Sequence, residues 1–370
     1  MSNPRRTMWL LVPLAIVSLV AASCSDSKSD NDSAAATTTT AKKVTGLDID
    51  YAKLTGTLNG TGSSFQDTLQ QTVKGAFAKV ATAVTVNYAK SGSKAGKADL
   101  AANIVQFAGT DSTIKPEELA GFTGGEVLYF PIAGGPITLS YNVAGVKDLK
   151  LSGDTIAGIF QGLITTWNDP KIAAENPDAK LPATTIAVVH RSDGSGTTSN
   201  FTKFLTKASP TVWLLGSGDT VNWAATTQGA EKNSGVAAVI TSTDGAIGYV
   251  DLADSVSAGL DRAQIKNAAG KYVEPKLPNA SAALEGATVA PDLTFDPINA
   301  AGPTAYPITA PTWMIVYSKQ PSAAVADALK GYLNYMLTEG QTLAPTVGYA
   351  ALPRSLQEKA IAQLSSITAG

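Results

Sequence analysis

Cysteine and histidine are almost absent from this chain: its 370 residues include one of each. A lone cysteine, Cys24, excludes a disulfide within the chain. With no second histidine beside His190, the chain lacks the ligands of an ordinary zinc site, and a Ser-His-Asp triad is disfavoured. We therefore expect no metal, no cofactor and no enzymatic activity. We interpret His190 as a structural residue or as part of the rim of a ligand cleft.

Charge is also scarce, since charged residues make up 16% of the chain and the formal net charge is −2. A nucleic-acid partner calls for an excess of basic residues, so the composition argues against one. Hydrophobic residues, at 44%, are frequent enough for folded domains with cores.

The N-terminus carries the longest apolar run. Arg5 and Arg6 precede an apolar stretch from Met8 to Val20, small residues follow it, and then comes Cys24. This pattern predicts a signal peptide over residues 1–23. The place of Cys24 makes it a candidate lipid acceptor, and a cleaved signal without lipid is the alternative. Residues 24–47 are mostly Ser, Asp, Ala and Thr, which predicts a flexible tether to the outer face of the cytoplasmic membrane.

One stretch, Arg191-Ser192-Asp193-Gly194-Ser195-Gly196-Thr197, is typical of a turn from a strand into a helix. A β-type run (185–189) precedes it, and an apolar stripe at helical spacing (201–208) follows it. The free N–H groups of a helix start form an anion site, and Arg191 adds a permanent charge that Asp193 can hold in place. A capped turn with a surface ion pair is the alternative.

Three more stretches lie, like Arg191–Thr197, at the end of a predicted strand or the start of a predicted helix. Gly60–Phe65 precedes a predicted helix that extends to Val80, and Ser91–Gly96 opens another whose apolar face includes Ile104. The β-type run Phe107–Ser112 includes the acid Asp111. Strands and helices alternate, so the class is α/β, in which ligands bind at the carboxyl ends of strands.

The rest of the chain is organised around these stretches. Phe130–Gly135, a strand that ends in two glycines, indicates a crossing between domains. We expect a buried strand at 245–250, a loop-rich region at 252–305, and helices at 323–337 and 354–364.

Two partial motifs are set aside. Gly92–Ala98 resembles a nucleotide P-loop but is one residue short between its glycines, and Ala98 replaces the magnesium-binding Ser or Thr. Ser91–Lys94 has the Ser-x-x-Lys spacing of acyl-enzymes without its usual companion motifs.

Together the four stretches resemble the phosphate-binding protein of the phosphate-specific ABC transporter. The likeness runs from about Gly56 to Ile367 and includes an intact Arg-x-Asp-Gly-Ser-Gly-Thr signature. It implies a type II periplasmic-binding-protein fold: two α/β domains joined by a two-crossing hinge, with the ligand cleft between them. The domains would be residues 48–132 with 307–370, and residues 133–306.

The resemblance also implies a set of phosphate-binding residues. Asp111 would accept a hydrogen bond from the phosphate's own proton, Asp193 would hold Arg191, and the others would donate to phosphate oxygens. The full set is Ser64, Phe65, Ser93, Asp111, Arg191, Asp193, Ser195, Gly196 and Thr197.

The implied partners are inorganic phosphate and a membrane complex of permease and ATPase, with the protein itself a monomer. Three alternatives stay open from the residues alone. The first is the same fold binding sulfate, molybdate or arsenate. The second is a phosphohydrolase with Ser93 or Ser195 as nucleophile, and the third is a surface protein without a ligand.

Overall fold

The computed structural model describes residues 43–370. The predicted signal peptide, Cys24 and most of the predicted tether lie outside the described residues. Contacts with the folded part begin earlier than the predicted end of the tether at residue 47, because Val44 is buried. In addition, the Leu47 N–H donates to Oδ1 of Asn334 at 2.8 Å.

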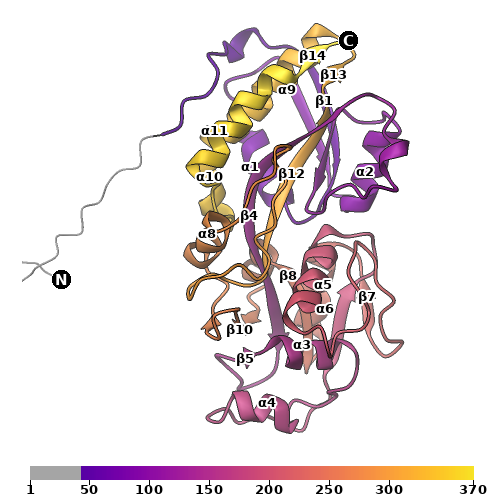
Figure 1. Cartoon of the computed structure of the whole chain (residues 1–370), viewed down its shortest axis with the longest axis vertical. Coiled ribbons are helices and arrows are strands. Elements are labelled where there is room, and N and C mark those ends of the chain that lie inside the picture. The colour runs from indigo at the N-terminus through magenta and orange to yellow at the C-terminus, as the bar shows by residue number, and fades with distance from the viewer. Residues whose placement is uncertain (1–42) are drawn as a thin grey trace, which may run out of the picture. The chain divides into compact units, whose positions relative to one another are not determined.

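The fold is built on one mixed sheet with two groups of parallel strands (Figure 1). The first group belongs to what we call the first lobe, and the second to the second lobe. The order across the sheet is β2 (Val84–Ala89), β1 (Gly56–Gly62), β3 (Phe107–Thr110), β12 (Thr309–Tyr317), β4 (Val127–Asn142), β8 (Ala246–Asp251), β6 (Ala187–Arg191) and β7 (Gln228–Ala230).

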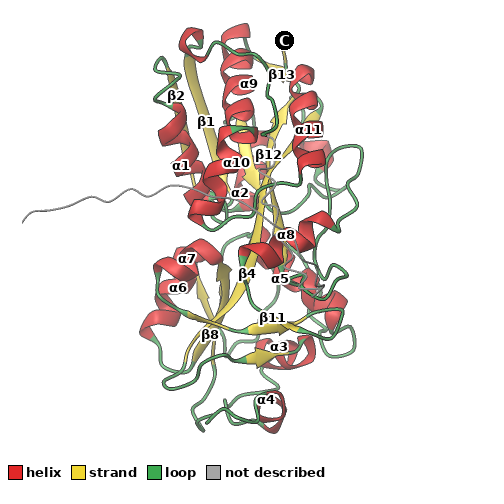
Figure 2. Ribbon diagram, turned by 90° about the vertical axis from the view of Figure 1, so that its left-hand side faces the viewer, coloured by secondary structure: helices red, strands yellow, loops and turns green. Residues whose placement is uncertain are grey.

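Strands β4 and β12 connect the two groups. They pair antiparallel with each other from Val127 to Pro136 of β4, and β4 then pairs with β8 from Ile137 to Asn142. The predicted crossing at 130–135 is therefore part of one unbroken 16-residue strand, with a register shift opposite Thr312 and Trp313. Figure 2 shows β4 passing from one lobe into the other, with α8 (Leu277–Glu285) beside it.

Helices cover the parallel groups. The first lobe has α1 (Asp67–Phe77), α2 (Ser93–Ala101), α9 (Ala323–Leu337), α10 (Glu339–Leu343) and α11 (Arg354–Gln363). The second lobe has α3 (Gly153–Phe160), α4 (Pro170–Glu175), α5 (Gly196–Ala208), α6 (Lys232–Ser242) and α7 (Leu252–Ser257). The predicted α/β class is confirmed, and α9 has the predicted bounds.

Two predicted helix ends are wrong. Helix α1 ends at Phe77, which leaves Val80 40% exposed, and α2 ends at Ala101, which leaves Ile104 65% exposed. Residues 252–305 are rich in loops, as predicted, with five short elements among them: α7, α8, β9 (Asp261–Arg262), β10 (Gln264–Lys266) and β11 (Tyr272–Val273). Helix α7 forms because the Asp251 carboxylate caps it, accepting from the Asp254 N–H at 2.8 Å.

Gly60 on β1 generates the first prediction. A Cβ at this position would lie 2.2 Å from the ring of Phe107, which is fully buried and stacked on Tyr88. The ring cannot move away, so we expect Gly60→Ala to lower the free energy of unfolding by about 1–3 kcal/mol.

The matched control is Gly75→Ala on α1, where a Cβ meets nothing within 4 Å. There the helix should gain roughly 0.5–1 kcal/mol. Urea unfolding of both variants checks this, and equal effects of the two substitutions would contradict the packing argument.

Candidate functional site

Ser195 is the N-cap of α5 and leaves the first N–H groups of the helix without an acceptor inside the helix. Ser195 Oγ accepts from the Thr198 N–H at 3.1 Å, and Ser195 O accepts from the Ser199 N–H at 3.0 Å. The N–H groups of Gly196 and Thr197 therefore belong to the first turn, where a helix supplies no acceptor of its own. They carry the partial positive charge of the helix start, as the sequence predicts.

Gly196 lets α5 approach the first lobe. A Cβ there would lie 2.5 Å from Ser93 Oγ and 2.8 Å from Asp111 Oδ2, so any side chain would clash with both. The starts of α5 and α2 and the end of β3 therefore meet at Gly196. The three elements come from predicted stretches that are distant in the sequence.

Arg191, at the end of β6, is 3% exposed and is fixed by a carboxylate. Its Nε and Nη2 donate to the two oxygens of Asp193 at 2.7 and 2.6 Å. Lys232 adds its own N–H and its Nζ to the same carboxylate, both at 3.1 Å. Burial opposes ionisation of Asp193, but Arg191 and then Lys232 outweigh it and lower the pKa of that carboxyl to about 2. The predicted pairing of Arg191 with Asp193 is present.

Asn233, in the first turn of α6, is a site residue that the sequence prediction missed. It is fully buried; its Oδ1 accepts from Arg191 Nη1 at 3.1 Å and its Nδ2 donates to Thr197 Oγ1 at 3.2 Å. Its N–H donates to Ser64 Oγ of the first lobe at 3.3 Å. The signal that could have found it is a polar pair, Lys232-Asn233, just before an apolar run at helical spacing.

Asp111 follows β3 and is 1% exposed. Its Oδ2 accepts from Ser63 Oγ at 2.5 Å and from Ser93 Oγ at 3.3 Å, and its Oδ1 accepts from Thr312 Oγ1 at 2.7 Å. Burial raises the pKa of the Asp111 carboxyl to about 6, although the hydroxyls of Ser63 and Thr312 and the charge of Arg191 favour the ionised form. Asp111 is thus a buried acid that can change protonation near neutral pH.

The main-chain N–H groups of two predicted site residues have partners inside the protein. The Phe65 N–H donates to Ser63 Oγ at 3.0 Å, and the Ser195 N–H donates to the carbonyl of Asp219 at 2.8 Å. The carbonyl of Phe65 accepts from the Tyr349 hydroxyl at 2.5 Å, which fixes the turn before α1.

The two lobes meet at these residues. Asn200 Nδ2 donates to the carbonyl of Asp111 at 2.5 Å, the Lys94 N–H donates to the carbonyl of Gly194 at 3.2 Å, and Lys232 Nζ donates to the carbonyl of Ser91 at 3.1 Å. We call this set of contacts the inter-lobe junction. All nine predicted site residues lie in it or next to it.

His190 precedes Arg191 on β6. Its ring stacks on Trp223 with centroids 4.9 Å apart, and burial lowers its pKa. This contact agrees with the structural interpretation of His190.

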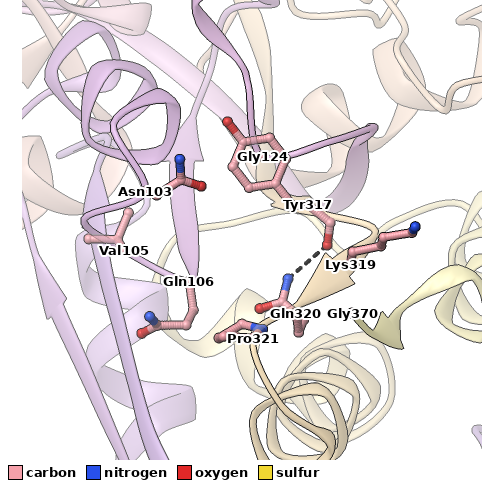
Figure 3. Close-up of a pocket in the computed structure, with 9 residues that line it drawn as sticks. All are labelled: Asn103, Val105, Gln106, Gly124, Tyr317, Lys319, Gln320, Pro321 and Gly370. Carbon is pink, nitrogen blue, oxygen red and sulfur yellow. Dashed lines mark hydrogen bonds between the residues drawn. The ribbon is translucent and has the colours of Figure 1, made fainter.

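A separate hollow of about 290 Å³ lies in the first lobe (Figure 3). Amide side chains, Tyr317 and Lys319 line it, and Gln320 Nε2 donates to the carbonyl of Tyr317 at 2.7 Å. None of the nine predicted residues lines this hollow. Within residues 43–370, no group of His, Cys, Asp and Glu is arranged to hold a metal ion, and no helix has the length and apolar character to span a membrane.

Comparison with known proteins gives concordant matches. Residues 32–339 match the family model of the PBP superfamily domain. The phosphate-binding protein PstS2 of Mycobacterium bovis is 35% identical over 323 residues, covering 84% of this chain and 87% of the relative. The phosphate-binding protein PstS of Pasteurella multocida is 35% identical over 315 residues, covering 83% and 89%.

Solved structures agree on the fold. A high-affinity periplasmic phosphate-binding protein bound with phosphate (PfluDING) superposes with a TM-score of 0.70 at 24% identity, covering 83% of this chain and 94% of that one. The phosphate-binding protein of Stenotrophomonas maltophilia gives 0.68 at 20% identity, with the same coverage. The predicted type II periplasmic-binding-protein fold is confirmed. The chain therefore belongs to the PBP superfamily and, within it, to the family of the PstS phosphate-binding proteins.

Proposed function

We propose that this protein binds inorganic phosphate outside the cytoplasmic membrane and delivers it to the permease of an ABC transporter. The observation that carries the proposal is a buried acid, Asp111, among converging donors that include Arg191 and the start of α5. At neutral pH phosphate offers several acceptor oxygens and at least one proton. Such a site, which has many donors and one acceptor, is complementary to that ion.

The donors are numerous enough for a useful affinity. A micromolar complex needs about 8 kcal/mol, and a hydrogen bond to a charged group contributes roughly 1.5–3 kcal/mol. The Ser93 hydroxyl has a single proton, which it donates to Asp111 at 3.3 Å, so it donates to phosphate only after that bond is released. We assign donation to the hydroxyl of Ser64, the N–H groups of Gly196 and Thr197, and the Arg191 guanidinium. Nη1 and Nη2 of that guanidinium each carry a second N–H beyond their bonds to Asn233 and Asp193.

The main-chain N–H groups of Phe65 and Ser195 differ from these donors. Because their N–H groups already have internal acceptors, they donate to phosphate only if the loops rearrange on binding. The Ser195 hydroxyl, which accepts from Thr198, still has its own proton to give.

The same site disfavours sulfate. Sulfate has no proton at neutral pH, so the Asp111 carboxylate would face it as acceptor against acceptor, whereas arsenate shares the protonation of phosphate. The site does not by itself decide against a phosphohydrolase, because the Asp111 carboxyl lies 3.3 Å from Ser93 Oγ, within reach of a general base. The relatives carry the name of binding proteins, and we propose a transport role without catalysis.

Release to the permease requires the lobes to separate, because Asn233 and Ser64 join them around the site. We propose residues 48–132 with 307–370 and residues 133–306 as the moving domains, with β4 and β12 as the hinge. The protein would act as a monomer.

The protonation of Asp111 generates the second prediction. Above pH 6 the carboxylate is ionised and can only accept, whereas below pH 6 it is protonated and can donate to a sulfate oxygen. The affinity for sulfate should therefore rise about tenfold or more as the pH falls through that value. The reason is that the buried Asp111 carboxyl is then neutral and donates to a sulfate oxygen, whereas the ionised carboxylate repels it. Equilibrium dialysis with labelled sulfate, well below and well above pH 6, measures this rise.

Asp111→Asn is the matched control, because it removes this ionisation and leaves His190 and the other acids in place. The variant should bind sulfate equally at both pH values and should lose selectivity more than it loses phosphate affinity. If wild type and variant show the same pH dependence of sulfate binding, Asp111 is not the group that distinguishes a protonated anion from an unprotonated one.

The third prediction concerns Cys24, which we propose as the site of a lipid anchor. Cys24→Ala should move the protein from the membrane fraction to the soluble fraction, because the tether would then have no acyl chain. Immunoblots of fractionated cells measure the shift. Retention of the variant in membranes at the wild-type level would argue against the anchor.

A further inference from the structure

Lys97 is a buried cation that the phosphate site does not use. It is 3% exposed and lies on α2 one turn after Ser93, so both side chains are on the same face of the helix. Its Nζ lies 2.9 Å from Asp219 Oδ2 and 3.2 Å from Glu118 Oε2. A buried ammonium is costly unless it is paired, so these carboxylates hold it in place.

The two carboxylates come from different lobes. Glu118 belongs to the first lobe, as Lys97 does, in the segment between β3 and β4. Asp219 belongs to the second lobe, in the segment between α5 and β7. The Lys97–Asp219 pair therefore bridges the lobes, whereas the Lys97–Glu118 pair stays inside one lobe.

Asp219 is also tied to the phosphate site. Its backbone carbonyl accepts from the N–H of Ser195, the N-cap of α5, at 2.8 Å. Asp219 itself is 8% exposed, so the pair is largely desolvated when the lobes are together. When the lobes separate, the pair must break and both groups return to water.

We propose that the Lys97–Asp219 ion pair is a latch that forms on closure and slows the release of phosphate. The inference rests on the proposed function and names residues outside the predicted site. Lys97 and Asp219 act as positioning residues: they hold the Ser195 end of α5 against α2, and they need no contact with the ligand.

The sign of the effect separates a latch from simple electrostatics. Asp219 carries a negative charge near the site, close enough to favour the protonated form of Asp111. By charge alone, Asp219→Asn should make the site more attractive to an anion. A latch gives the opposite result, because Lys97 loses its partner across the junction and remains buried.

The test compares Asp219→Asn with Glu118→Gln. Each substitution removes one negative charge next to the same ammonium, but only the first breaks a bridge between lobes. The measurements are the release rate of labelled phosphate into excess unlabelled phosphate, at fixed ionic strength, and the thermal midpoint with and without phosphate. The purified full chain is used, with Lys97→Met as a second variant from the other side of the bridge.

We expect Asp219→Asn to release phosphate about tenfold faster, since loss of a buried partner acts on dissociation. Its midpoint without phosphate should match wild type, and the upward shift produced by phosphate should be smaller. Glu118→Gln should keep the release rate within about twofold of wild type. Lys97→Met should release phosphate at least as fast as Asp219→Asn.

Three results would overturn the latch. Slower release or tighter binding by Asp219→Asn would mean that its charge acts only on the anion. Equal acceleration by Glu118→Gln would mean that the ammonium, not the bridge, matters. If Asp219→Asn lowers the thermal midpoint equally with and without phosphate, the ion pair stabilises the fold and is not specific to the closed state. Absence of phosphate binding by the wild type would instead refute the proposed function.

Discussion

The site depends on one constraint: each charged side chain that is buried there must have hydrogen-bonding or ionic partners. Arg191, Asp193 and Asp111 lie where water is largely excluded, and an unpaired ion there would be costly. Arg191 is therefore held by two carboxylate oxygens and an amide, and Asp111 by three hydroxyls. In the proposed function, the donors left over at this junction bind one more anion, phosphate. Many of these donors are uncharged hydroxyl and backbone N–H groups, so a chain with a negative net charge can still bind an anion.

The sheet brings these groups together. Both parallel groups end at the inter-lobe junction, and each of β1, β3 and β6 delivers a site residue shortly after or at its last residue. Strands β4 and β12 run the other way and join the groups, so Thr312 on β12 reaches Asp111 although 201 residues separate them. Gly196 completes the arrangement, because a side chain there would keep the lobes apart.

The sequence predicted the parts of the site that depend on local rules. Ser195 and the glycines around it have the spacing of a helix start, and α5 begins at the predicted place. Asp111 was predicted as the acid that closes a strand. The α/β class followed from the alternation of strands and helices, and the fold and the proposed phosphate-binding residues came from the resemblance to a known family.

What could not be predicted depends on contacts between distant segments. Asn233, Thr312 and Asp219 have ordinary neighbours in the sequence, and only the meeting of the lobes gives them their partners. Helix ends were also misplaced: nothing in the local pattern stops α2 at Ala101 rather than after Ile104. Tertiary packing decides such boundaries, and propensity alone does not.

The most direct measurement of the central claim is a crystal structure of residues 43–370 with phosphate. We predict tetrahedral density at the inter-lobe junction, within hydrogen-bond distance of Asp111, Arg191 and the N–H groups of Gly196 and Thr197. Phosphate bound elsewhere, or density at the junction that Asp111 does not contact, would contradict the account.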